Sequence, residues 1–174
     1  LNPNTDAKTL SQISTGKKEN KFGVSEKIFL NLVEYVKNSN FLKLKCLSVH
    51  IGSQILDHKP YGKMLKVIQK IIDKTKFKFE YIDLGGGMGV DYKKNNEKLN
   101  LRKYSFYLKT FLKKNSSKII FEPGRSIVAN AGYLISKIIY IKQTDKKDFI
   151  IIDAAMNDLM RPALYNAEHK IAPT

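Results

Sequence analysis

The sequence has 174 residues, of which 43% are hydrophobic, and this is enough apolar material for an ordinary globular domain. Its formal net charge is +15, but the lysines are scattered through helices and loops without a recognisable nucleic-acid-reading motif. We therefore expect no nucleic-acid partner. No apolar run reaches the length of a membrane helix and no signal peptide is recognisable, so we expect a soluble, cytoplasmic protein with no membrane partner.

Cys46 is the single cysteine of the sequence. It has no partner for an internal disulfide or for a C-x-x-C metal or redox site, which agrees with a reducing compartment. The simplest interpretation of Cys46 is a small core residue in a strand, and we predict no metal site.

The first predicted unit is a helix followed by a strand. After a polar, irregular opening over residues 1–24, Ser25 can cap a helix. Residues 38–40 break this helix, and residues 46–51 are predicted to form a buried strand that ends at Gly52. The spacing of its apolar residues gives the helix a predicted buried face, made of Ile28, Phe29, Leu32, Val33 and Val36.

Two further helix–strand pairs repeat this plan. Strands are predicted at residues 79–84 and 119–121, about 35 residues apart, each after one amphipathic helix. This alternation is typical of right-handed βαβ units on a parallel sheet, and both a doubly wound sheet and a (β/α)8 barrel fit it. The helix faces consist of Tyr61, Met64, Leu65, Ile68, Ile71 and Ile72 in one helix, and of Tyr104, Tyr107, Leu108, Phe111 and Leu112 in the other.

The pattern changes beyond residue 129. Residues 133–143 and 149–153 are predicted to be two strands joined by the polar turn 144–147, with no helix between them. Such a pair is antiparallel. We therefore predict a first domain over residues 1–127 and the start of a β-rich domain over residues 128–174.

Three motifs each follow one of the predicted parallel strands. They are His50-Ile51-Gly52-Ser53, Leu84-Gly85-Gly86-Gly87 and Glu122-Pro123-Gly124-Arg125. Ligands of α/β proteins bind at the edge where parallel strands end, because the loops there surround one cavity. The three motifs are therefore expected to face one pocket.

Each motif taken alone leaves an alternative open. The glycine triplet can bring backbone N–H groups close to a phosphate, or it can be a plain tight turn. Glu122 can hold a proton on a pyridine nitrogen, or it can form a structural ion pair with Arg125. His50 can stack on a flat cofactor or be an ordinary core histidine, and Ser53 can donate to a phosphate.

In this order, the three motifs resemble those of the fold-type III pyridoxal-phosphate decarboxylases. The resemblance implies an alanine-racemase-like (β/α)8 TIM barrel, in its second part, followed by the start of a C-terminal β-domain, with pyridoxal 5'-phosphate as cofactor. It implies that His50 stacks on the cofactor ring and that Glu122 meets the pyridinium nitrogen, which makes these the expected catalytic residues. The other implied cofactor contacts are Ser53, Gly85, Gly86, Gly87, Pro123, Gly124 and Arg125.

The segment Arg161-Pro162-Ala163-Leu164-Tyr165 is similar to the diaminopimelate decarboxylases within this family, as is Ile13-Ser14-Thr15-Gly16 followed by Lys21-Phe22-Gly23. A guanidinium and a phenol can grip a carboxylate far from the reacting carbon, so Arg161 and Tyr165, with Arg125, are the expected substrate-binding residues. An ornithine-type substrate would require an acidic residue instead. The implied reaction converts meso-2,6-diaminopimelate to L-lysine and CO2 in lysine biosynthesis, and the family implies a homodimer.

The sequence also departs from the family pattern. The Schiff-base lysine of the family would precede Leu1, and its catalytic cysteine would lie beyond Thr174, so Cys46 is not that cysteine. We therefore expect an internal fragment that is inactive by itself. The alternatives are another fold-type III amino-acid decarboxylase and a non-catalytic remnant that binds pyridoxal phosphate.

Overall fold

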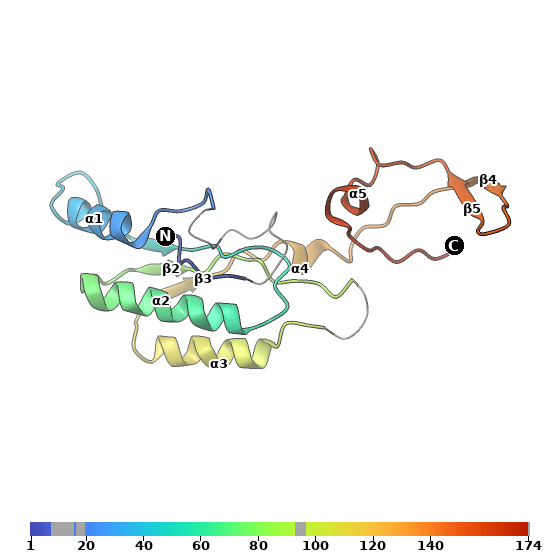
Figure 1. Ribbon diagram of the computed structural model, residues 1–174. Helices are drawn as coiled ribbons and strands as arrows, with labels where there is room; N and C mark the ends of the chain where they lie inside the picture. The colour runs from blue at the N-terminus through green and yellow to red at the C-terminus, as the bar shows by residue number, and fades with distance from the viewer. Residues whose placement is uncertain (8–15, 17–19, 93–96, 174) are drawn as a thin grey trace. The chain divides into compact units, whose positions relative to one another are not determined.

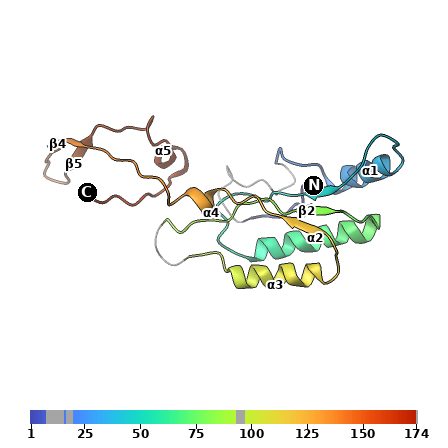
Figure 2. The ribbon, with the colours of Figure 1, turned by 180° about the vertical axis from the view of Figure 1, so that it is seen from behind.

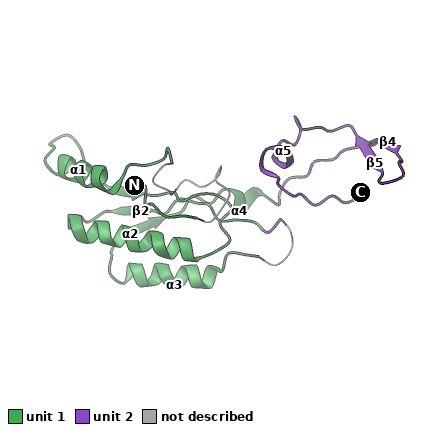
Figure 3. Cartoon of the chain, in the orientation of Figure 1, with its two compact units in different colours: residues 1–90, 97–129 green, residues 91–96, 130–174 purple. Residues whose placement is uncertain are grey.

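A computed structural model describes residues 1–7, 16, 20–92 and 97–173. The chain forms two compact units, drawn in different colours in Figure 3. Unit 1 contains residues 1–90 and 97–129, and unit 2 contains residues 91–96 and 130–174. The assignment of residues 1–127 to a barrel and of residues 128–174 to a β-domain remains a prediction.

A parallel three-stranded sheet forms the centre of unit 1. Its strands are β1 (Cys46–Ser48), β2 (Tyr81–Asp83) and β3 (Lys118–Ile120), in the order β1-β2-β3. Leu47 lies opposite Ile82, and both side chains are completely buried. The predicted strands are confirmed; β1 and β2 are shorter than expected, and β3 has the expected length but begins one residue earlier.

Three helices precede the three strands and pack against one another. They are α1 (Glu26–Lys37), α2 (Lys59–Thr75) and α3 (Leu101–Leu112). α2 and α3 run side by side in both Figure 1 and Figure 2, and α1 contacts α2. Right-handed crossovers between consecutive strands place successive helices on the same face of a sheet. A segment of a (β/α)8 barrel has this arrangement, with sequential parallel strands and helices between them.

The predicted apolar faces are confirmed for α2 and partly wrong for α1 and α3; in α3, Leu112 is 37% exposed, whereas the other predicted residues are buried or partly buried. In α2, five of the six predicted residues are buried and Ile72 is partly buried. Ser25 caps α1 as expected, since its side chain accepts a hydrogen bond from the Ile28 N–H. In α1, however, Ile28 and Leu32 are 50% and 46% exposed, because α1 contacts the rest of the described chain mainly through its other apolar residues.

The prediction that strand β3 is buried is also wrong. Ile120 and the following Phe121 are each 39% exposed. β3 is an edge strand of the described sheet, with β2 on one side only. Its side chains are therefore covered less than those of the central strand.

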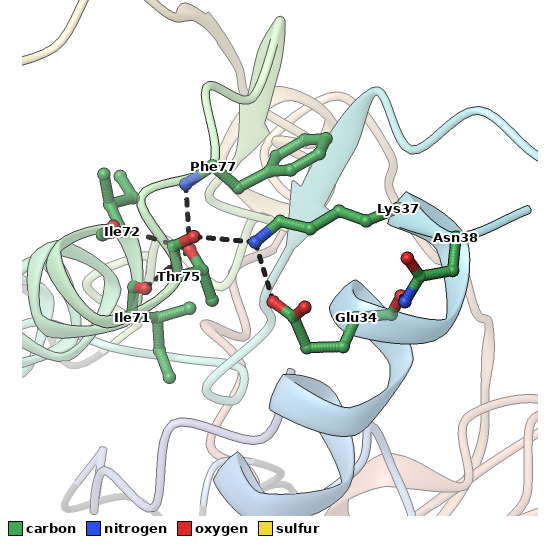
Figure 4. Close-up of polar contacts among 7 residues, drawn as sticks. All are labelled: Glu34, Lys37, Asn38, Ile71, Ile72, Thr75 and Phe77. Atoms are coloured by element: carbon green, nitrogen blue, oxygen red, sulfur yellow. Dashed lines mark hydrogen bonds and ion pairs between the residues drawn. The ribbon is translucent and has the colours of Figure 1, made fainter.

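Polar contacts join α1 to the end of α2 at the amino-terminal side of the sheet (Figure 4). The Lys37 ammonium donates to Glu34 Oε1 at 2.7 Å and to the Thr75 carbonyl at 3.0 Å. The buried Thr75 hydroxyl donates to the Ile71 carbonyl and accepts from the Phe77 N–H at 3.2 Å. These contacts fix the point where the chain leaves α2 and turns towards β2.

Unit 2 contains an antiparallel strand pair, β4 (Ile138–Lys142) and β5 (Phe149–Ile152), which confirms the predicted hairpin. Two short helices were not predicted: α4 (Arg125–Val128) in unit 1 and α5 (Arg161–Tyr165) in unit 2. α5 has Pro162 in its first turn, where the missing N–H costs nothing. Among the described residues, no helix has both the length and the apolar character needed to cross a bilayer.

Candidate functional site

The three predicted motifs meet at one edge of the sheet, because backbone pairing continues beyond the ends of the strands. The Val49 N–H donates to the Asp83 carbonyl at 2.9 Å, which aligns the chain before His50 with the chain before the glycines. The Glu122 N–H donates to the Gly85 carbonyl at 2.9 Å. His50, the glycine loop and Glu122 therefore lie side by side at the carboxyl ends of β1, β2 and β3, as the sequence predicts.

The glycine loop, residues 85–87, has a backbone that only glycine adopts easily. Gly85 and Gly87 have φ angles of 64° and 86°, in the left-handed region. A Cβ atom on Gly86 would lie 2.1 Å from the Glu122 carbonyl oxygen, and one on Gly87 would lie 2.1 Å from the Gly52 carbonyl oxygen. The absent side chains allow all three loops to approach one another.

His50 is exposed at this edge and is held by the glycine loop. Its Nδ1 atom accepts a hydrogen bond from the Gly86 N–H at 3.3 Å. A ring nitrogen that accepts a hydrogen bond carries no proton, so this contact requires the neutral ring with its proton on Nε2. The imidazole is thus held in position by the glycine loop. His50 is not a core histidine.

Arg125 contacts the loop that follows β1. Its Nη1 atom donates to Gln54 Oε1 at 3.3 Å, and Gln54 also pairs with the backbone of Val90 through both its amide atoms. Among the ion pairs of the described residues, none joins Glu122 to Arg125, so the alternative of a structural ion pair is not realised. Ser53 lies beside Gln54 and is half-buried.

Three supporting residues at this edge were not identified from the sequence. Asp83 is buried, and its carboxylate accepts from the Gly85 N–H at 2.9 Å and from the Ser48 hydroxyl at 3.0 Å. Gln54 has a φ of 61°, an uncommon value for a residue other than glycine. Tyr61 donates its hydroxyl proton to the Gly86 carbonyl at 3.1 Å. The sequence signal for Asp83 was an acidic residue at the end of a predicted strand, two residues before the first glycine of the loop.

Unit 2 has a separate polar cluster around Arg161. The Arg161 guanidinium donates to the Tyr92 hydroxyl at 3.2 Å, lies 5.0 Å from the centre of the Tyr92 ring, and approaches His169 Nε2 at 3.4 Å. Tyr165, predicted as the second substrate contact, is 38% exposed at the end of α5. Tyr92 was missed because it precedes Arg161 by 69 residues.

The carboxyl-end edge of unit 1 fits a phosphate-bearing cofactor. Within the described part of the chain, the Gly87 and Gly124 N–H groups donate to no backbone or side-chain acceptor. A Cβ on Gly124 would meet nothing within 4 Å, so the backbone there faces open space. Free backbone donors beside open space are what a bound phosphate requires. Pro123 lies between Glu122 and this glycine.

A family profile and the sequence relatives of this chain identify the same family. The profile of the pyridoxal-dependent decarboxylases, pyridoxal binding domain, matches residues 1–129. The diaminopimelate decarboxylases of Helicobacter pylori and Aquifex aeolicus (strain VF5) are 45% and 40% identical over 98% and 99% of this chain. The chain spans 43% and 42% of their lengths, which is less than half.

Solved structures agree with the sequence comparison. The crystal structure of diaminopimelate decarboxylase from Helicobacter pylori complexed with L-lysine has a TM-score of 0.91 and 43% identity, covering 100% of this chain and 45% of that chain. The enzyme from M. jannaschi has a TM-score of 0.84 and 33% identity, covering 98% of this chain and 42% of that chain. The chain therefore belongs to the pyridoxal-dependent decarboxylases, whose cofactor is pyridoxal phosphate.

Proposed function

We propose that the full-length protein decarboxylates meso-2,6-diaminopimelate to L-lysine and CO2. The observation that carries this proposal is the edge shared by His50, the glycine loop and Glu122, in a chain whose relatives carry the name diaminopimelate decarboxylase. Along this edge lie the flat imidazole ring of His50, free backbone N–H donors and the carboxylate of Glu122. A phosphorylated pyridine requires these three kinds of group.

The cofactor residues are assigned from the chemistry of their groups. When bound, pyridoxal phosphate supplies an electron-accepting ring that makes loss of the α-carboxylate possible. The carboxylate of Glu122 keeps the pyridine nitrogen protonated, and the neutral ring of His50 stacks on the cofactor. The phosphate is held by the hydroxyl of Ser53 and by the free backbone N–H groups of Gly87 and Gly124.

The substrate residues are assigned separately, because two of them belong to unit 2. Arg125 is held by Gln54 and offers the rest of its guanidinium to a carboxylate. Arg161 binds the distal carboxylate of diaminopimelate, with Tyr165 as a second donor. Tyr92 and His169 support this assignment, since both contact the guanidinium of Arg161 and neither is a carboxylate that would already pair with it. A planar guanidinium held on one side can still form two parallel hydrogen bonds on another side.

The test is Arg161→Lys in the full-length protein, loaded with pyridoxal phosphate. Lysine keeps the charge but loses the bidentate geometry, so we expect the KM for diaminopimelate to rise about tenfold or more. The matched control is Arg102→Lys, at an exposed position of α3, for which kcat and KM should stay unchanged.

Three results would contradict parts of this proposal. An unchanged KM in Arg161→Lys would remove Arg161 from the substrate site. Turnover of lysine or ornithine in preference to diaminopimelate would favour another amino-acid decarboxylase. Full-length protein that binds no pyridoxal phosphate would be a non-catalytic relative.

A further inference from the structure

Tyr61 connects helix α2 to the glycine loop. Its side chain is completely buried, and its hydroxyl donates to the Gly86 carbonyl at 3.1 Å. The ring stacks on Tyr104 of α3, with the ring centres 4.4 Å apart. Burial raises the pKa of the Tyr61 hydroxyl, so the group keeps its proton and remains a donor over the physiological pH range. An apolar side chain could fill the same core position, but it could not form this hydrogen bond.

Gly86 links Tyr61 to His50, because it forms a hydrogen bond with each of them. Its carbonyl accepts from Tyr61, and its N–H donates to His50 Nδ1 at 3.3 Å. Glycine has more backbone freedom than any other residue. The orientation of the peptide groups of Gly86 therefore depends on the hydrogen bonds that they form with neighbouring residues. Tyr61 and His50 fix the peptide groups on the two sides of Gly86.

The same hydrogen bond decides where the next N–H points. The described backbone contains no cis peptide bond, so the Gly86–Gly87 peptide is trans. The C=O and N–H of a trans peptide point in opposite directions. Because the carbonyl points to Tyr61 in the core, the Gly87 N–H points away from α2 and has no acceptor among the described residues. This N–H is thus kept available for a ligand.

We propose that Tyr61 is a positioning residue of the cofactor site. Its hydroxyl holds the Gly86 carbonyl inward, which turns the Gly87 N–H outward to the cofactor phosphate and keeps the Gly86 N–H on His50. This inference rests on the proposed cofactor binding at the same edge. The role concerns the hydroxyl alone and not the packing of the ring.

The test compares Tyr61→Phe with Tyr104→Phe in the full-length protein after removal of the cofactor. Each variant loses one hydroxyl from the same buried stack, but only Tyr61→Phe loses the bond to Gly86. Titration with pyridoxal phosphate, followed by absorbance, should show a Kd about fivefold to tenfold higher for Tyr61→Phe, as expected for one lost hydrogen bond. The Kd of Tyr104→Phe should stay within about twofold of the unchanged protein.

Either of two results would overturn the proposal. The first is an unchanged Kd in Tyr61→Phe. The second is an equal rise in Kd in both variants, which would mean that the stack acts only through packing. Unchanged protein that fails to bind pyridoxal phosphate would instead overturn the proposed function, so the two failures are distinguishable.

A second measurement begins with the unchanged protein, so its first result does not depend on whether the variants fold. The imidazole nitrogens of His50, observed by 15N NMR in the full-length protein, should show a proton on Nε2 and none on Nδ1. In Tyr61→Phe, the Nδ1 signal should move because the Gly86 N–H is no longer held. A proton on Nδ1 in the unchanged protein would overturn the connection through Gly86.

Discussion

The two ends of the parallel sheet in unit 1 are held together by different kinds of contact. At the carboxyl end, backbone groups of glycines meet other backbone groups and short polar side chains, as in the bonds from Gly85 to Asp83 and from Gly86 to His50. At the amino end, long charged side chains make the contacts, as between Lys45 and Glu80 at 3.8 Å and between Lys37 and Glu34.

The two ends of the sheet should therefore tolerate substitutions to different degrees. Long side chains at the amino end can move when a neighbour changes, and exposed ion pairs contribute little free energy. Backbone atoms at the carboxyl end cannot move without moving a strand. We therefore expect substitutions to cost most at the carboxyl end, where the candidate site lies, and least among the ion pairs.

The largest effect is expected for Gly86→Ala. The new Cβ would lie 2.1 Å from the Glu122 carbonyl oxygen, which belongs to the backbone and cannot rotate away. Overpacking of this kind costs at least about 2 kcal/mol, and the affinity for pyridoxal phosphate should fall with it. Urea unfolding and cofactor titration of the full-length protein measure the two effects.

Gly132→Ala is the matched control, because a Cβ there meets nothing within 4 Å. Its free energy of unfolding should stay within about 0.5 kcal/mol of the unchanged protein. Equal stability of the two variants would mean that the close approach of the three loops is not required.

A smaller but still clear effect is expected for Asp83→Ala. The substitution leaves the buried Gly85 N–H and the Ser48 hydroxyl without their acceptor. Loss of a partner for a buried donor costs about 1 to 3 kcal/mol, and here it should also loosen the glycine loop. Asp73→Ala, on the exposed side of α2, is the comparison and should cost less than about 0.5 kcal/mol. If the two variants unfold at the same urea concentration, Asp83 does not hold the loop.

These expectations show what could be predicted from the sequence and what could not. The meeting of three distant motifs at one edge was predictable, because parallel strands bring their carboxyl ends together. Tyr61 was predicted only as part of an apolar helix face, since spacing reveals burial but not the destination of a hydroxyl. Gln54 and Tyr92 act on residues 71 and 69 positions away, and sequence spacing carries no information on such contacts.

The exposed residues of α1 illustrate a second limit of prediction. Helical periodicity correctly identified an apolar side that includes Phe29 and Val33. It could not indicate how wide a strip of that side α2 and the sheet would cover. Ile28 and Leu32 lie beyond that strip.

The smallest effect is expected for Glu26→Gln at the junction of α1 and α2. Glu26 pairs with Lys74 and, at 3.4 Å, with Lys70, and all three side chains are at least one third exposed. The hydrogen bond from Lys74 lowers the pKa of the Glu26 carboxyl below its usual value. A carboxyl with a lowered folded pKa stabilises the protein above its unfolded pKa, and this contribution is lost as the pH falls through the folded pKa.

Glu26→Gln should therefore reduce the free energy of unfolding at pH 7 by about 0.2 to 1 kcal/mol, the range of exposed ion pairs. The difference from the unchanged protein should disappear at acidic pH, where Glu26 is protonated in both states, and should shrink at about 1 M salt. Urea unfolding of both proteins at neutral pH, at acidic pH and in high salt tests this. A loss as large as that of Gly86→Ala would mean that the ion pairs at the amino end are as rigid as the glycine contacts at the carboxyl end.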